Sequence, residues 1–106
     1  MSSDSNWTDV AALTDVFEGA AIAVTPKGQD IALFNVEGAI YATQNVCSHG
    51  NANLCDGYLE GFEIECPFHQ GRFDVRTGQA TLLPCTEPVK IWPVKIEGGR
   101  VFLALD

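Results

Sequence analysis

Two short segments of the sequence combine cysteine with histidine. They read Cys47-Ser-His49 and Cys66-Pro-Phe-His69, sixteen residues lie between His49 and Cys66, and the sequence has no other histidine. Thiolate and imidazole bind soft and borderline metals, so one Cys and one His from each segment predict a site with four ligands. In the first segment an extended backbone would put both side chains on one side, and in the second Pro67 would fix a tight turn that directs both toward one point.

Two kinds of metal site fit these residues: a structural zinc held by two Cys and two His, or a Rieske [2Fe–2S] cluster with two Cys on one iron and two His on the other. Zinc fingers usually pair Cys with Cys and His with His along the chain, whereas each segment here supplies one of each. A cluster with two adjacent irons needs that mixture, because each loop must reach both irons. The pattern therefore favours the cluster, and zinc is the alternative.

The remaining sequence predicts an all-β scaffold for these loops. Short stretches rich in β-forming residues alternate with glycine turns, and no window shows a long helical period. A short helical turn or irregular entry is expected at 11–17, and the segment 46–72, rich in Gly, Asn, Cys and His, has the composition of loops that hold something. We expect strands at 20–25, 30–36, 39–44, 62–65, 71–75, 89–97 and 100–105, with turns at 26–29, 37–38 and 98–99.

Composition limits what the protein can be. Its 106 residues fit one compact domain and leave no room for a second, catalytic one. Fourteen acidic against six basic residues give a net charge of −8, which argues against nucleic acid and anionic membranes as partners. No apolar run exceeds five residues and the start lacks a basic segment, so we expect no membrane span, no secretion signal and a cytoplasmic location. With only four Cys, we expect Cys55 and Cys85 to be free, partly buried thiols.

The two metal-binding segments and their surroundings resemble the Rieske-type ferredoxins of bacterial aromatic-ring dioxygenase systems, most closely the naphthalene and biphenyl kind. The run from Glu65 to Gly78 (ECPFHQGRFDVRTG) and the segment Cys47-Ser-His49-Gly50 carry this resemblance, which extends over nearly the whole chain. It implies a single Rieske domain over 1–106, with an antiparallel β-sandwich base, a small cluster-binding subdomain inserted at about 45–80, and a third loop near Pro84 that covers the cluster.

Carried over residue by residue, the resemblance implies that Cys47 and Cys66 bind one iron of a Rieske-type [2Fe–2S] cluster and that His49 and His69 bind the other. It further implies a one-electron carrier between an NAD(P)H-dependent flavoprotein ferredoxin reductase and a terminal Rieske oxygenase, an electron-transfer component and not an enzyme. A carrier that docks with two partners in turn is expected to be a monomer.

Two other functions are compatible with these residues. A Rieske-like small subunit of an assimilatory nitrite reductase has a similar length, although such subunits often lack ligands that are complete here. The second is a zinc-stabilised interaction module without a redox role.

Departures from the respiratory Rieske proteins predict a low reduction potential. Those proteins tie their loops with a disulfide at positions that are Ala52 and Phe68 here, and they place hydroxyl groups near the cluster at positions that are Gly71 and Phe73 here. Hydrogen bonds to sulfur stabilise the reduced cluster, so their loss predicts a potential at the low end of the Rieske range, roughly −150 mV.

Charge around the two loops is uneven. No Lys or Arg lies between positions 50 and 65, where the sequence could form either a solvated face or a docking patch. Arg72 and Arg76 follow the second loop and could offset this charge or meet an acidic partner. The acidic residues of the stretch are Asp56, Glu60, Glu63 and Glu65.

Overall fold

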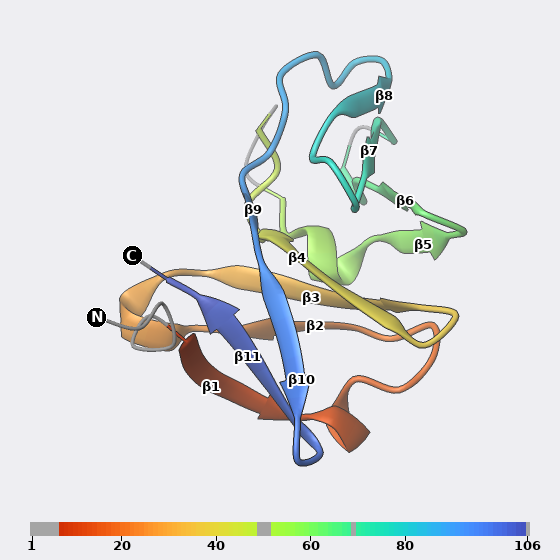
Figure 1. Ribbon diagram of the computed structural model, residues 1–106. Coiled ribbons are helices and arrows are strands. Elements are labelled where there is room, and N and C mark those ends of the chain that lie inside the picture. The colour runs from red at the N-terminus through yellow and green to blue at the C-terminus, as the bar shows by residue number, and fades with distance from the viewer. Residues whose placement is uncertain (1–6, 49–51, 69, 106) are drawn as a thin grey trace.

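The computed structural model describes residues 7–48, 52–68 and 70–105. Within these ranges the chain consists of β-strands in three antiparallel sheets and three short 3-10 helices, which confirms the predicted all-β class (Figure 1). The strands are β1 (Trp7–Ala12), β2 (Ala21–Val24), β3 (Ile31–Val36), β4 (Ala39–Gln44), β5 (Tyr58–Glu60), β6 (Glu63–Glu65), β7 (Arg72–Asp74), β8 (Ala80–Leu82), β9 (Ile91–Trp92), β10 (Val94–Glu97) and β11 (Arg100–Ala104), and the 3-10 helices are η2 (Leu13–Asp15), η3 (Pro26–Gly28) and η4 (Leu54–Asp56).

Strand β3 is the centre of the molecule, because all six of its residues are buried. Side chains alternate between the two faces of a strand. Ile31 and Leu33 therefore pack with Leu103 of β11, in the core between the sheet β2-β3-β4-β9 and the sheet β1-β11-β10. Phe34, on the opposite face, packs with Ile64 and the other buried residues of the third sheet. One strand thus contributes to two cores.

The third sheet, β5-β6-β7-β8, is a meander inserted between β4 and β9. These two strands pair with each other through Ala42 with Trp92 and Thr43 with Ile91. The chain between them therefore leaves the base sheet and returns to the strand it left. Figure 1 shows β5 to β8 on one side of the base, above β3 and β4, and the segment after β8 passing over that end of the molecule before it descends into β9.

The expected hairpin turns are present. Gly98 and Gly99 both have positive φ, +58° and +75°, as a type I′ turn between β10 and β11 requires. Glu37 and Gly38 likewise have positive φ between β3 and β4.

The prediction of one strand over 89–97 is wrong, because Pro93 divides it. Proline has no backbone N–H for a ladder hydrogen bond. Ile91 and Trp92 pair with β4, whereas β10 begins at Val94 and pairs with β11, so the chain changes sheets at this proline.

Strands β1, β5 and β8 were not predicted. Strands β5 and β8 have only three residues each, and all three sequences lack an alternating apolar pattern, so only pairing with partner strands defines them. The helical turn expected at 11–17 is the 3-10 helix η2, but Ala11 and Ala12 belong to β1. No helix in the described ranges is long and apolar enough to cross a membrane.

Leu33→Ala should lower the free energy of unfolding by about 2–5 kcal/mol, because it leaves a cavity at a side chain that is 0% exposed. The matched control is Leu83→Ala, at a leucine that is 73% exposed, with an expected change below about 0.5 kcal/mol. Urea denaturation of both variants measures the difference, and equal losses would contradict the assignment of Leu33 to the core.

Candidate metal centre

The two predicted cysteine ligands are buried together. Cys47 lies three residues after β4 and Cys66 directly follows β6, and their exposed fractions are 3% and 0%. Both belong to one apolar cluster that includes Phe34, Ile64 and Phe73. The fold therefore brings sulfur from two distant segments into the same apolar surroundings.

His49 and His69, the other two predicted ligands, lie outside the described residues. In the described part of the chain, no group of three or more Cys, His, Asp or Glu side chains forms a metal-binding arrangement. The two thiols are thus the described portion of the predicted donor set. Buried sulfur in apolar surroundings suits an iron–sulfur cluster, because the metal neutralises thiolates that would otherwise be costly to bury.

Asn45 fixes the first loop to the base. The side chain is only 2% exposed, its Nδ2 donates to Asp30 Oδ1 at 3.0 Å, and its Oδ1 accepts from the backbone N–H of Cys55 at 2.9 Å. The backbone carbonyl of Asn45 also accepts from Leu54 N at 2.6 Å, and Cys47 N donates to Ala52 O at 2.8 Å. These bonds close the chain around Cys47 with no disulfide.

The second loop is a tight turn, as Pro67 predicted. The backbone N–H of Cys66 donates to Gly71 O at 2.7 Å, and the N–H of Gln70 donates to Cys66 O at 3.0 Å. These two bonds return the chain directly into β7 and leave Phe68 70% exposed.

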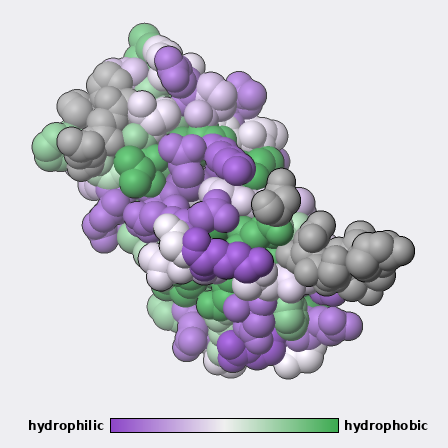
Figure 2. Space-filling model, turned by 90° about the vertical axis from the view of Figure 1, so that its left-hand side faces the viewer, coloured by the Kyte–Doolittle hydropathy of each residue, from purple (hydrophilic) through white to green (hydrophobic). Residues whose placement is uncertain are grey.

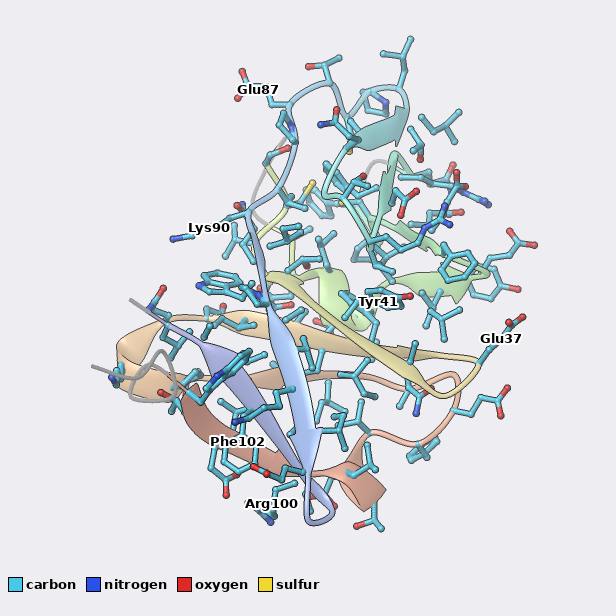
Figure 3. All side chains as sticks on the ribbon, viewed as in Figure 1. Glu37, Tyr41, Glu87, Lys90, Arg100 and Phe102 are labelled. Carbon is cyan, nitrogen blue, oxygen red and sulfur yellow. The ribbon has the colours of Figure 1, made fainter. Side chains whose placement is uncertain are left out.

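A third loop, residues 83–90, joins β8 to β9 and is hydrogen-bonded to the first loop and to the turn between β7 and β8. Ser48 Oγ donates to Glu87 O at 2.7 Å, and Val89 N donates to Gly78 O at 2.8 Å. Gln44 holds the return to β9, because its N–H donates to Lys90 O and its Oε1 accepts from Lys90 N, both at 2.8 Å. Figure 3 shows Glu87 and Lys90 along this segment.

Cys85 in this third loop is a component of the site that sequence reasoning missed. Its Sγ lies 3.9 Å from Cys47 Sγ and the residue is 2% exposed. Burial, reinforced by the neighbouring Cys47, raises the pKa of the Cys85 thiol to about 12, so the thiol is protonated at neutral pH. All four cysteines are free, as predicted for Cys55 and Cys85, but Cys85 is buried within the site. The available sequence signal was the position of Cys85 next to Pro84, in the third loop that was expected to cover the cluster.

The acidic run after the first loop is largely paired. Arg72 Nη1 lies 3.0 Å from Glu60 and 3.3 Å from Glu63, and its Nη2 lies 3.0 Å from Glu65. One guanidinium group therefore meets three carboxylates of the run, so Arg72 offsets their charge inside this chain.

Arg76 also has an internal partner. Its guanidinium lies 2.8 Å from Asp74 and stacks 4.0 Å from the centre of the Phe62 ring. The hydrogen bonds from Arg76 hold the pKa of the Asp74 carboxyl below its usual range. The Phe62 ring in turn packs at 82° to the ring of Tyr41 of β4, and this contact joins the third sheet to the base.

Comparisons with known proteins identify the class. Residues 6–93 match the family model "Rieske [2Fe-2S] domain". The chain is 56% identical over 100 residues to the ferredoxin component of the naphthalene 1,2-dioxygenase system of Pseudomonas putida, a match that covers 94% of this chain and 96% of that protein. This chain belongs to the Rieske [2Fe-2S] domain family.

Solved structures of ferredoxins have the same fold as this chain. A ferredoxin of Sphingomonas yanoikuyae B1 superposes with a TM-score of 0.90 at 43% identity, covering 95% of this chain and all of that one. A chain from a complex of reduced oxygenase and oxidized ferredoxin in carbazole 1,9a-dioxygenase superposes with a TM-score of 0.88 at 39% identity, covering 93% of each. The prediction of a Rieske-type ferredoxin, an electron carrier with a [2Fe–2S] cofactor, is confirmed.

Gly71→Ala should disturb the contact between the second and third loops. A Cβ at this position would collide with the Cys85 side chain and come within 2.9 Å of Cys85 N. We expect a lower melting temperature and reduced cluster retention, measured by thermal unfolding and by iron content. The control Gly61→Ala adds a methyl that meets nothing within 4 Å, at a φ of +59°, and should cost only about 1–2 kcal/mol of backbone strain. Equal losses in both variants would show that the contact with Cys85 is unimportant.

Proposed function

We propose that this protein carries single electrons from an NAD(P)H-dependent flavoprotein ferredoxin reductase to the terminal Rieske oxygenase of an aromatic-ring dioxygenase system. The observation that carries the proposal is the burial of Cys47 and Cys66 in one apolar cluster, in a chain of the Rieske family. In the proposed site these thiolates hold one iron, and His49 and His69 hold the other.

The bound cluster would supply the one-electron chemistry, and the chain determines its surroundings. Cys47 and Cys66 provide sulfur from a buried position, and the apolar side chains of their cluster exclude water from it. The hydrogen bonds of Asn45 and Gly71 keep both loops closed, so little of the scaffold has to move on electron transfer. We propose that residues 45–80 form the cluster-binding subdomain of a single domain over 1–106.

The relatives support the proposed electron acceptor. The ferredoxin component of a naphthalene 1,2-dioxygenase system and the ferredoxin complexed with its oxygenase both support a terminal oxygenase as acceptor. The reductase as donor, a monomeric state and a cytoplasmic location belong to the same proposal. A nitrite reductase small subunit is also structurally similar, with a TM-score of 0.80, but at 22% identity it supports the fold alone.

The docking face is proposed at the end of the molecule where the second and third loops meet. Segment 66–71 enters β7 at Arg72, whose partner is Leu82, the last residue of β8, so both loops start from the same end of this sheet. Phe68, Leu82 and Leu83 are exposed there. Figure 2 views the side of the molecule that lies to the left in Figure 1, and this side carries hydrophilic residues with smaller hydrophobic groups among them. A limited apolar rim of this kind suits a transient interface.

Cluster ligation is tested by spectroscopy. The dithionite-reduced protein should give a rhombic EPR signal, and metal analysis should give the iron that one [2Fe–2S] cluster per chain requires. Cys47→Ser, His49→Ala and His69→Ala should each abolish the signal. The control Cys55→Ser should keep it, because Cys55 lies outside the proposed ligand set. One zinc per chain without an EPR signal would overturn the electron-transfer function in favour of a zinc-stabilised module.

Docking is tested by Leu83→Asn and a matched control, Phe17→Asn. Loss of an apolar contact from the interface should raise the Kd for the oxygenase about tenfold, the effect of roughly 1.4 kcal/mol. Phe17 is 67% exposed and follows η2, which bonds to the β10–β11 turn at the opposite end of the molecule (Figure 1). Stopped-flow reduction of a naphthalene-type terminal oxygenase by the reduced ferredoxin measures the effect. An equal or larger effect of Phe17→Asn would place docking elsewhere.

A further inference from the structure

We propose that the Cys85 thiol donates a hydrogen bond to the sulfur of Cys47 and thereby raises the reduction potential of the cluster. Cys85 would be a positioning residue that acts through Cys47 and does not bind iron itself. The inference rests on the proposed role of Cys47 as a ligand. It goes further by assigning a function to a thiol outside the two metal-binding segments.

The sulfur atoms of the two residues are 3.9 Å apart, within the range for a hydrogen bond between thiols. In that pair either sulfur could be the donor. A cysteine that binds iron does so as a thiolate, without a proton. Cys47 as a ligand can therefore only accept, and Cys85 must donate.

Burial keeps water away from this pair of sulfur atoms. Both cysteines are at most 3% exposed, so solvent does not compete with Cys85 for the sulfur of Cys47. Because no bulk water reaches this pair, a lost S–H donor would not be replaced by solvent. The bond is therefore worth more here than on the surface.

The neighbouring backbone fixes the position of Cys85. Gly71 leaves the space that the Cys85 side chain occupies, since a Cβ on residue 71 would collide with it. Bonds from Ser48 to Glu87 and from Val89 to Gly78 hold the part of the loop that follows Cys85. The thiol is thus held against Cys47 by packing and by the hydrogen bonds of the segment after it.

Reduction would add one negative charge to the cluster that Cys47 would help to hold, which would make the ligand sulfur a better hydrogen-bond acceptor. A hydrogen bond to a more negative acceptor is stronger, so Cys85 would stabilise the reduced state more than the oxidised state. Stabilising the reduced state raises the potential. Removing the donor should therefore lower it.

The test compares Cys85→Val, which fills the space without a donor, with Cys85→Ser, which retains one. We expect the Val variant to be harder to reduce by a factor of 3 to 10 in the equilibrium constant, a shift of about 30 to 60 mV to more negative potential at 59 mV per tenfold. The Ser variant should stay at or above the potential of the parent protein. Protein-film voltammetry measures both, and Cys55→Val is the control that should leave the potential unchanged.

A second readout is the Fe–S stretching frequency in resonance Raman spectra. The difference between spectra in H₂O and D₂O should shrink in the Val variant and persist in the Ser variant, which packing alone would not produce. Equal potentials for Val and Ser variants that both hold a full complement of iron would overturn the role of Cys85 and leave the proposed function intact. Absence of an iron–sulfur cluster from the parent protein would instead overturn the proposed function.

Discussion

The structure depends on one constraint, the burial of sulfur from Cys47 and Cys66 in an apolar core. A thiolate without a counter-charge is costly in such surroundings, whereas a thiolate bound to iron shares its charge with the metal. The apolar cluster around these residues includes Phe34 of the base and Ile64 and Phe73 of the third sheet. The same apolar cluster joins the base to the third sheet and surrounds Cys47 and Cys66. The proposed cofactor site is therefore continuous with the hydrophobic core.

Three loops must converge for this arrangement, and the pairing of β4 with β9 makes them do so. The first loop leaves the end of β4, and the third returns into β9 beside it, through the paired Gln44 and Lys90. The second loop lies within the meander between them. No disulfide is present among the described cysteines, and backbone hydrogen bonds together with the buried Asn45 side chain hold the loops instead.

Several acidic side chains of the third sheet form ion pairs with nearby arginines. Arg72 gathers three carboxylates of the third sheet, and Arg76 is paired with Asp74 while stacking on Phe62. Two of the six basic residues of the chain are thus committed within the third sheet. In the proposed function, the net charge of −8 would steer the protein toward partners with basic faces, and the apolar rim at the loops would supply the close contact.

The sequence by itself was sufficient for the all-β class, the glycine hairpins and the iron–sulfur cofactor, because alternation, turn residues and ligand type are local properties, while its assignment of the four ligand residues stays a prediction. It could not predict β1, β5 and β8, since strands of this kind are defined by their partners, and it missed the change of sheet at Pro93. Above all, it treated Cys85 as a spare thiol. Only the tertiary structure decided that residue 85 lies against residue 47, because a contact across 38 positions arises from how the loops pack and leaves no local pattern.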